Sequence, residues 1–166
     1  QKMVTLDTGH FHLTESIADK LSSLLLFTPE VMLHVSRPVR WDSDHVVILN
    51  DDLLDLSREI VRCDALSRVH IGLDYFDATI NRIGAYVVGI RATQKALLRA
   101  LLEPRALLSE FEEEKRLFER LALQEEVKSL PWPAVWDMFC LRQEVPVGED
   151  YIQEVERYEA EVTSKR

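Results

Sequence analysis

The sequence predicts a parallel α/β fold that is followed by a helical extension, and three observations support this prediction. In residues 1–103, short apolar runs of β-strand character alternate with longer segments of helical periodicity, which is typical of βα units around a parallel sheet. Three of the apolar runs lead directly into an Asp or a His. After Pro104 the sequence becomes densely charged and keeps only a helical pattern. We therefore expect the last three or so βα units of a TIM (β/α)₈ barrel in residues 1–103 and a C-terminal helical extension in residues 104–166.

The three predicted strands are short, and each ends just before a polar side chain. Residues 3–6 lead into Asp7, residues 31–33 lead into His34, and residues 69–73 lead into Asp74. In a parallel barrel the loops after the strands share one rim, so the side chains at these three ends are expected to converge.

Helical sequence follows each predicted strand. Thr14 is placed to cap a helix over about residues 15–27, and Pro29 ends that helix. Asp51 and Asp52 open the second helix, and a long third helix runs up to Pro104. The residues expected on the buried face of the second helix are Leu53, Leu56, Ile60 and Val61.

Residues 104–166 are expected to form further helices that serve packing or oligomerisation. Apolar residues at positions 107, 111, 118 and 121 keep helical spacing through a densely charged stretch. Another helix is expected to start near Pro131, and a last one is expected over about residues 149–164. We find no cluster of metal-type ligands in this part of the sequence, so we expect it to wrap the barrel or pair with another subunit.

A piece of barrel of this size is expected to be incomplete. A full barrel needs eight strands and about 250 residues. Three parallel strands leave two open edges and an uncovered inner face, to which we assign Val4, Leu33 and Ile71. The missing strands come either from another chain or, as the favoured interpretation, from a larger polypeptide of which this sequence is the C-terminal part.

Composition argues against several classes of partner. Hydrophobic residues make up 46% of the 166 residues, which is enough for one domain-sized core. A net charge of −9 argues against nucleic acid or an anionic membrane surface as a partner. No apolar stretch approaches the roughly 20 residues of a membrane span. Cys63 and Cys140 lack metal-type spacing and are typical of reduced cysteines in a cytoplasmic protein.

Six side chains form a candidate metal site. Oxygen ligands with a minority of imidazoles suit Mn²⁺ or Mg²⁺, and by affinity also Co²⁺ and Zn²⁺. Two of the carboxylates, Asp42 and Asp44, are close enough to hold one cation together and would repel each other without a cation or a basic partner. The six candidates are Asp7, His10, His34, Asp42, Asp44 and Asp74.

Each candidate also has a simpler explanation. Asp7 and Asp74 can cap a turn or a helix, and a single His at a strand end is often a hydrogen-bonded core residue. Arg37 and Arg40 can neutralise the carboxylate pair. The occurrence of one such residue after each of three successive strands nevertheless favours a metal site. Among the remaining candidates, His70 is expected to be structural, and the roles of His12, His45 and Asp77 stay open.

Three blocks of the sequence resemble the bacterial L-rhamnose isomerase family. They are LDTGHFH at 6–12, HVSRPVRWDSDH at 34–45 and HIGLDYFD at 70–77. The resemblance continues through residues 96–104 and 130–132, so it covers essentially the whole chain. Uninterrupted runs of this length are far more specific than a short motif.

The resemblance implies a (β/α)₈ barrel, a homotetramer and two adjacent divalent cations. By position, the ligands of a structural ion, for which Zn²⁺ or Co²⁺ are alternatives to Mn²⁺, are Asp7, His34 and Asp74. The ligands of a catalytic Mn²⁺ are His10, Asp42 and Asp44. Family members share a further Glu that bridges the ions and a Lys that contacts the sugar, both on an upstream strand that we do not find here. We therefore expect the chain alone to be inactive.

The activity that the resemblance implies is the conversion of L-rhamnose to L-rhamnulose in rhamnose catabolism, by a metal-assisted 1,2-hydride shift. Asp42, His10 and Asp44 are then the catalytic candidates. One alternative is another divalent-metal barrel enzyme acting on sugars, such as an isomerase, an epimerase or an aldolase. The other is a non-catalytic helical fragment that serves assembly. Substrate breadth, the preferred ion and the residue that handles the proton stay open.

Overall fold

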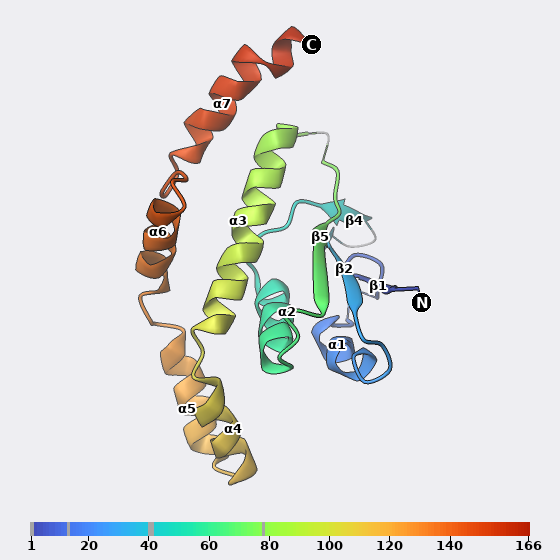
Figure 1. Ribbon diagram of the computed structural model, residues 1–166, viewed down its shortest axis with the longest axis vertical. Coiled ribbons are helices and arrows are strands. Elements are labelled where there is room, and N and C mark those ends of the chain that lie inside the picture. Colours follow the sequence, from blue (N-terminus) through green and yellow to red (C-terminus); the bar gives the residue numbers. More distant parts are fainter. Residues whose placement is uncertain (1, 13, 40–41, 78) are drawn as a thin grey trace.

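A parallel sheet of three strands forms the centre of the α/β part. The computed structural model describes residues 2–12, 14–39, 42–77 and 79–166, with only the backbone described for 42–44. The strands are β1 (Val4–Asp7), β2 (Val31–Val35) and β5 (Val69–Leu73), in the order β1-β2-β5 (Figure 1). Both pairs are parallel, and the register places Asp7 opposite His34. The prediction of a parallel α/β fold from these three runs is confirmed.

One face of the sheet packs against helices. Helices α1 (Ala18–Leu24), α2 (Asp51–Arg62) and α3 (Arg82–Leu101) follow the strands in sequence. Val31, Leu33 and Val35 alternate with half-buried residues along β2 and belong to the same core as residues of these helices. Alternation along a strand puts every second side chain on the same face. The other face of β2 therefore carries Met32 and His34.

We predicted that Leu33 and Ile71 lie on the uncovered inner face of the sheet, and for both residues this prediction is wrong. The Leu33 side chain is 0% exposed, because it lies in the core beneath the helices. Ile71 also packs against this core, whereas Val4 is 37% exposed. Strand periodicity separates the side chains of β2 into two faces, but it does not tell which face the helices cover. In β2 the helices cover the face that carries Leu33, and His34 lies on the other face.

The helix boundaries mostly follow the sequence, but α1 differs from the prediction at both ends. It begins at Ala18, later than predicted, and ends at Leu24, before Phe27. The Thr14 hydroxyl bonds the His12 ring instead of capping the helix. Helix α2 begins at Asp51 as predicted, and the Asn50 side chain caps it by accepting a bond from the Leu53 N–H. The four residues predicted for its buried face, Leu53, Leu56, Ile60 and Val61, are all buried.

A short antiparallel hairpin follows β2 and lies outside the parallel sheet. Its strands are β3 (Arg37–Val39) and β4 (Asp42–His45), and Val39 pairs with Asp42. The hairpin therefore carries the backbone of the two candidate carboxylates, and their side chains lie outside the described residues.

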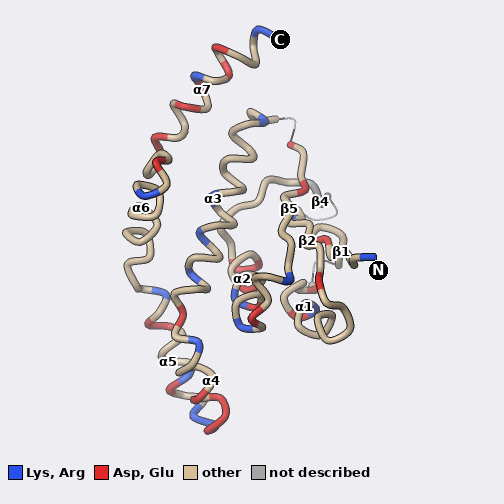
Figure 2. Tube along the Cα trace, viewed as in Figure 1, with Lys and Arg blue, Asp and Glu red and all other residues tan. Residues whose placement is uncertain are grey.

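The C-terminal helices form an outer column beside α3 (Figure 1). Charged residues of both signs are spread along α4, α5 and α7 (Figure 2). Lys115 has a φ of 58° between α4 and α5, which interrupts the helical stripe predicted through this stretch. The elements are α4 (Arg105–Glu113), α5 (Leu117–Val127), α6 (Trp132–Arg142), α7 (Tyr151–Glu161) and a short 3₁₀ turn, η1 (Thr163–Lys165).

A column of cations on α3 binds the outer helices. The Arg91 guanidinium carbon lies 5.2 Å from the ring centroid of Trp136 and 4.7 Å from that of Tyr151. Lys95 lies 5.4 Å from Trp136, and Arg99 lies 5.1 Å from the next aromatic ring along α6, that of Trp132. The spacing of four residues places the three cations on one side of α3. Each cation–π contact contributes about 0.5–2 kcal/mol, and the contribution is larger where the contact is shielded from solvent.

Among the described residues, no helix is long and apolar enough to cross a membrane. Both cysteines, Cys63 and Cys140, are free. The cytoplasmic location expected from them stays a prediction.

Arg68 ties the loop between α1 and β2 to the sheet, and its loss is expected to destabilise the protein. Its guanidinium donates to the carbonyls of Leu25, Thr28 and Pro29 at 2.7, 3.0 and 2.7 Å. Hydrogen bonds to charged groups contribute about 1.5–3 kcal/mol, and three carbonyls lose their donor together. We expect Arg68→Ala to lower the free energy of unfolding by about 2–3 kcal/mol.

Denaturant unfolding of the intact protein measures this effect. Arg157→Ala provides the matched control, because Arg157 is 63% exposed and pairs only with its helix neighbour Glu154 among the contacts described. Surface substitutions of that kind change stability by less than about 0.5 kcal/mol. Equal unfolding midpoints for the two variants would contradict the role given to Arg68.

Candidate metal centre

The ends of the three parallel strands bring Asp7, His34 and Asp74 together. The Nδ1 atom of His34 lies 3.0 Å from an Asp74 carboxylate oxygen and 3.6 Å from an Asp7 carboxylate oxygen. Asp7 closes β1, His34 lies near the end of β2, and Asp74 follows β5 directly. The predicted convergence of these three side chains on one rim is therefore found.

Backbone groups at the strand ends hold the triad in place. The Gly9 N–H donates to the second carboxylate oxygen of Asp7 at 2.9 Å, which leaves the first one facing His34. The Thr8 N–H donates to the His34 carbonyl at 2.9 Å, and the Asp74 N–H donates to the Val35 carbonyl at 3.1 Å. These bonds continue the sheet beyond the strands and so limit how the three ligand-bearing residues move.

Thr8 and Ser36 form a second tie between the ends of β1 and β2. The Thr8 hydroxyl donates to the Ser36 carbonyl at 2.8 Å and accepts from the Ser36 N–H at 2.8 Å. We did not predict this pair from the sequence. Its one signal is a hydroxyl residue directly after Asp7, which is too common to be informative.

The triad fits a divalent cation. One ligand atom from each residue lies within 4.8 Å of the others. Metal–ligand distances of about 2.0–2.3 Å place opposite ligands of one ion just over 4 Å apart, so only a small contraction is needed. Two carboxylates and one imidazole are also the donor set that Mn²⁺, Co²⁺ and Zn²⁺ accept. The side chain of Asp74 is 58% exposed, which leaves this face accessible.

His10 lies at the edge of this cluster. Its Nε2 atom is 3.8 Å from Asp7, and its side chain is 65% exposed. His10 therefore lies beside Asp7, another of the six candidate ligands. Asp42 and Asp44, which we expected beside His10, lie on β4 with their side chains outside the described residues.

The other polar candidates take part in local contacts. The ring of His70 lies 3.1 Å from the Glu30 carboxylate, and the structural role expected for it stays a prediction. Hydrogen bonds from the Thr79 hydroxyl and N–H lower the pKa of Asp77, which belongs to the loop after β5.

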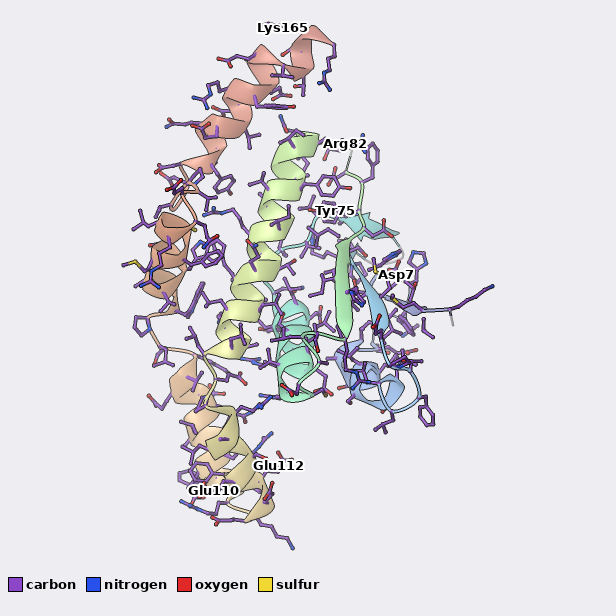
Figure 3. All side chains as sticks on the ribbon, viewed as in Figure 1. Asp7, Tyr75, Arg82, Glu110, Glu112 and Lys165 are labelled. Atoms are coloured by element: carbon purple, nitrogen blue, oxygen red, sulfur yellow. The ribbon has the colours of Figure 1, made fainter. Side chains whose placement is uncertain are left out.

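A buried tyrosine follows Asp74 directly. Tyr75 is 4% exposed although its neighbour lies at an open rim. Burial, together with the nearby Tyr86, raises the pKa of Tyr75 to about 12, so its phenol keeps its proton at physiological pH. Figure 3 shows Tyr75 between β5 and α3, on the side of the sheet away from Asp7. We did not predict a role for this residue from the sequence.

A cavity lies beside the triad, on the helix side of the strand ends. Asp7, His34 and Asp74 do not line it. Its walls include Thr8, Phe11, Val35, Ser36 and Leu53. The triad therefore faces outward from the sheet, on the side that the described helices leave uncovered.

The fold and the site define an α/β protein with a metal-type ligand cluster at the carboxyl ends of parallel strands. A model of the family L-rhamnose isomerase (RhaA) matches residues 1–166. The chain is 72% identical over 165 residues to the L-rhamnose isomerase of Bacteroides thetaiotaomicron. It is 56% identical over 166 residues to the L-rhamnose isomerases of Enterobacter sp. (strain 638) and Escherichia coli (strain K12).

The chain belongs to the L-rhamnose isomerase family. The three alignments cover 99 or 100% of this chain. The chain spans about 40% of the length of the curated relatives that it matches.

Proposed function

We propose that the intact protein containing this chain is a divalent-metal-dependent aldose–ketose isomerase that converts L-rhamnose to L-rhamnulose. The observation that carries the proposal is the Asp7–His34–Asp74 cluster, in a chain that matches the family along its whole length. The cluster provides ligand atoms for a cation, and the proposed reaction and sugar are those of the family.

The ligands divide into two sets in this proposal. The structural ion, with Zn²⁺ or Co²⁺ as alternatives to Mn²⁺, would be held by Asp7, His34 and Asp74. The catalytic Mn²⁺ would be held by His10, Asp42 and Asp44. When bound, such an ion supplies a Lewis acid for sugar oxygens and lowers the pKa of a bound water.

The residues of this chain would hold and orient the reacting groups. The isomerisation moves a hydrogen from C2 to C1 and a proton between O2 and O1, and a 1,2-hydride shift accounts for the first of these. We assign to Asp42 the part of assisting the proton transfer, with His10 and Asp44 as the other catalytic candidates. The Gly9 N–H and the His34 ring orient the Asp7 carboxylate by contacts of 2.9 and 3.6 Å.

The rest of the intact protein would complete the barrel. We propose that residues 1–103 are the C-terminal portion of a (β/α)₈ barrel and that residues 104–166 serve packing and oligomerisation in a homotetramer. Exposed apolar side chains on α5 support the second part, since Leu117, Phe118 and Leu121 are 63, 79 and 58% exposed. The bridging Glu and the sugar-contacting Lys that the resemblance implies would lie in the rest of the intact protein, outside these 166 residues.

Removal of divalent metal is expected to abolish turnover of L-rhamnose by the intact protein. The physical reason is that charge stabilisation by a bound cation supplies several kcal/mol of the barrier reduction. The measurement is L-rhamnulose formation after dialysis against a chelator, followed by addition of Mn²⁺, Co²⁺ or Zn²⁺. Undiminished turnover after dialysis would refute the proposal.

A panel of sugars separates this proposal from its alternatives. We expect the highest kcat/KM with L-rhamnose among aldoses, epimerisable ketoses and aldol substrates. A metal-dependent activity on another class of sugar substrate would instead favour a different barrel isomerase, epimerase or aldolase. Absence of metal binding by the intact protein would favour a non-catalytic assembly role.

A further inference from the structure

Tyr75, the residue after Asp74, is fixed to helix α3 through both its side chain and its backbone. The Tyr75 phenol donates to the Ala85 carbonyl at 2.8 Å, and both residues are buried. At the other end, the Tyr86 hydroxyl donates to the Tyr75 backbone carbonyl at 3.3 Å. The two tyrosine rings stack, with centroids 5.0 Å apart and planes inclined by 23°. Side chain and backbone of Tyr75 are therefore fixed to the same stretch of one helix.

Gly89 makes room for the Tyr75 ring on α3. A Cβ atom at this position would lie 2.1 Å from the Tyr75 hydroxyl oxygen and 2.9 Å from ring atom Cζ. Both distances are far inside van der Waals contact, so either the ring or the helix would have to move. A glycine inside a helix costs about 1 kcal/mol relative to alanine, and close approach of another group is a common reason for one.

We propose that Tyr75, Tyr86 and Gly89 form a clamp that positions Asp74 for cation binding. On the sheet side, Asp74 is held through its N–H, which donates to the Val35 carbonyl at 3.1 Å. On the helix side, it is held through its peptide link to Tyr75. The carboxylate of this exposed residue stays 3.0 Å from His34 Nδ1 because its backbone is fixed from both sides. The inference rests on the proposed metal-dependent function and adds to it a set of positioning residues on α3.

The clamp acts on metal affinity, which distinguishes it from a simple packing contact. A group that orients a ligand lowers the cost of ordering that ligand on binding, and loss of such a group typically weakens metal binding by about 10–100-fold. A ring that merely fills the core would change the unfolding temperature and leave the affinity of the folded protein unchanged. Affinity measured on the folded apoprotein therefore separates the two roles.

The experiment compares Mn²⁺ binding by the intact protein and its variants, using the electron paramagnetic resonance signal of free Mn²⁺. Gly89→Ala is expected to raise the Mn²⁺ dissociation constant by about tenfold or more. Tyr75→Phe keeps the ring and removes only the bond to Ala85, so a smaller rise in the same direction is expected. It serves as the deciding variant if Gly89→Ala does not fold. Circular dichroism in chelator establishes folding of each apoprotein.

Gly84→Ala is the matched control on the same helix. A Cβ atom there would meet Val155 and Asn81 at 3.5 and 3.6 Å, which are ordinary contacts, so wild-type Mn²⁺ affinity is expected. Folded Gly89→Ala or Tyr75→Phe protein with wild-type affinity would overturn the clamp and leave the proposed function standing. Failure of the wild-type intact protein to bind any divalent cation would overturn both.

Discussion

Asp74→Asn in the intact protein is expected to lower both turnover and metal-dependent stability, whereas Asp42→Asn and Asp44→Asn are expected to lower mainly turnover and to leave the fold intact. Asp74 lies in the cluster at the ends of β1, β2 and β5, so an ion bound there links three strands of one sheet. Asp42 and Asp44 lie on the separate β3–β4 hairpin. An ion that binds only the folded protein stabilises it by about 2.7 kcal/mol at 100 times its dissociation constant. This stabilisation is lost when Asp74 can no longer hold the ion at the ends of the three strands.

Two measurements on each variant test this division. We expect kcat to fall by at least about 100-fold in all three variants, which corresponds to about 2.7 kcal/mol in the activation barrier. The difference in melting temperature between Mn²⁺ and chelator is expected to shrink most for Asp74→Asn. Asp64→Asn is the control, because that side chain is 93% exposed. Its φ of 54° is one that Asn tolerates. Equal melting temperatures of wild type and Asp74→Asn with metal present would contradict the division.

The strand ends could be predicted from sequence because one local pattern encodes both the fold and the ligands. Each of three apolar runs leads into an Asp or a His, and parallel strands expose such positions on one rim. The structure brings Asp7, His34 and Asp74 together, as this pattern predicts. The same is true of α2, whose apolar periodicity and opening acidic residues located both its start and its buried face.

Features that depend on contacts between distant segments could not be predicted in this way. Leu33 was placed on the uncovered face because periodicity alone does not tell which face of a strand the helices choose. The hairpin after β2 has a register shift and a proline, and it lacks the apolar alternation of a strand. Gly89 is unusual in the sequence, because a glycine inside a helix is unfavourable unless another group approaches closely. The group that approaches is the Tyr75 ring, which belongs to the loop after β5 and could not be identified from the sequence around Gly89.

The isolated 166-residue chain is expected to show no L-rhamnose isomerase activity and no sharp cooperative unfolding. Within the described part of the chain, β1 and β5 each pair only with β2, so the sheet has two open edges. Large apolar side chains also face solvent, since Leu26, Phe27 and Phe118 are 82, 84 and 79% exposed. Full burial of each such side chain contributes about 1.5–3 kcal/mol, against a typical net stability of about 5–15 kcal/mol.

Size-exclusion chromatography, thermal unfolding and an isomerase assay on the chain alone, beside the intact protein, test this expectation. Helical circular dichroism is expected to persist in part, because Leu21, Leu33 and Ile60, which are 0–1% exposed, contact residues of the same chain. Activity is expected to be lost even so, since the triad faces a side of the sheet that the described helices leave open. A monomeric chain with a sharp transition and isomerase turnover would show that one helix-covered face and the C-terminal column are sufficient for a working site.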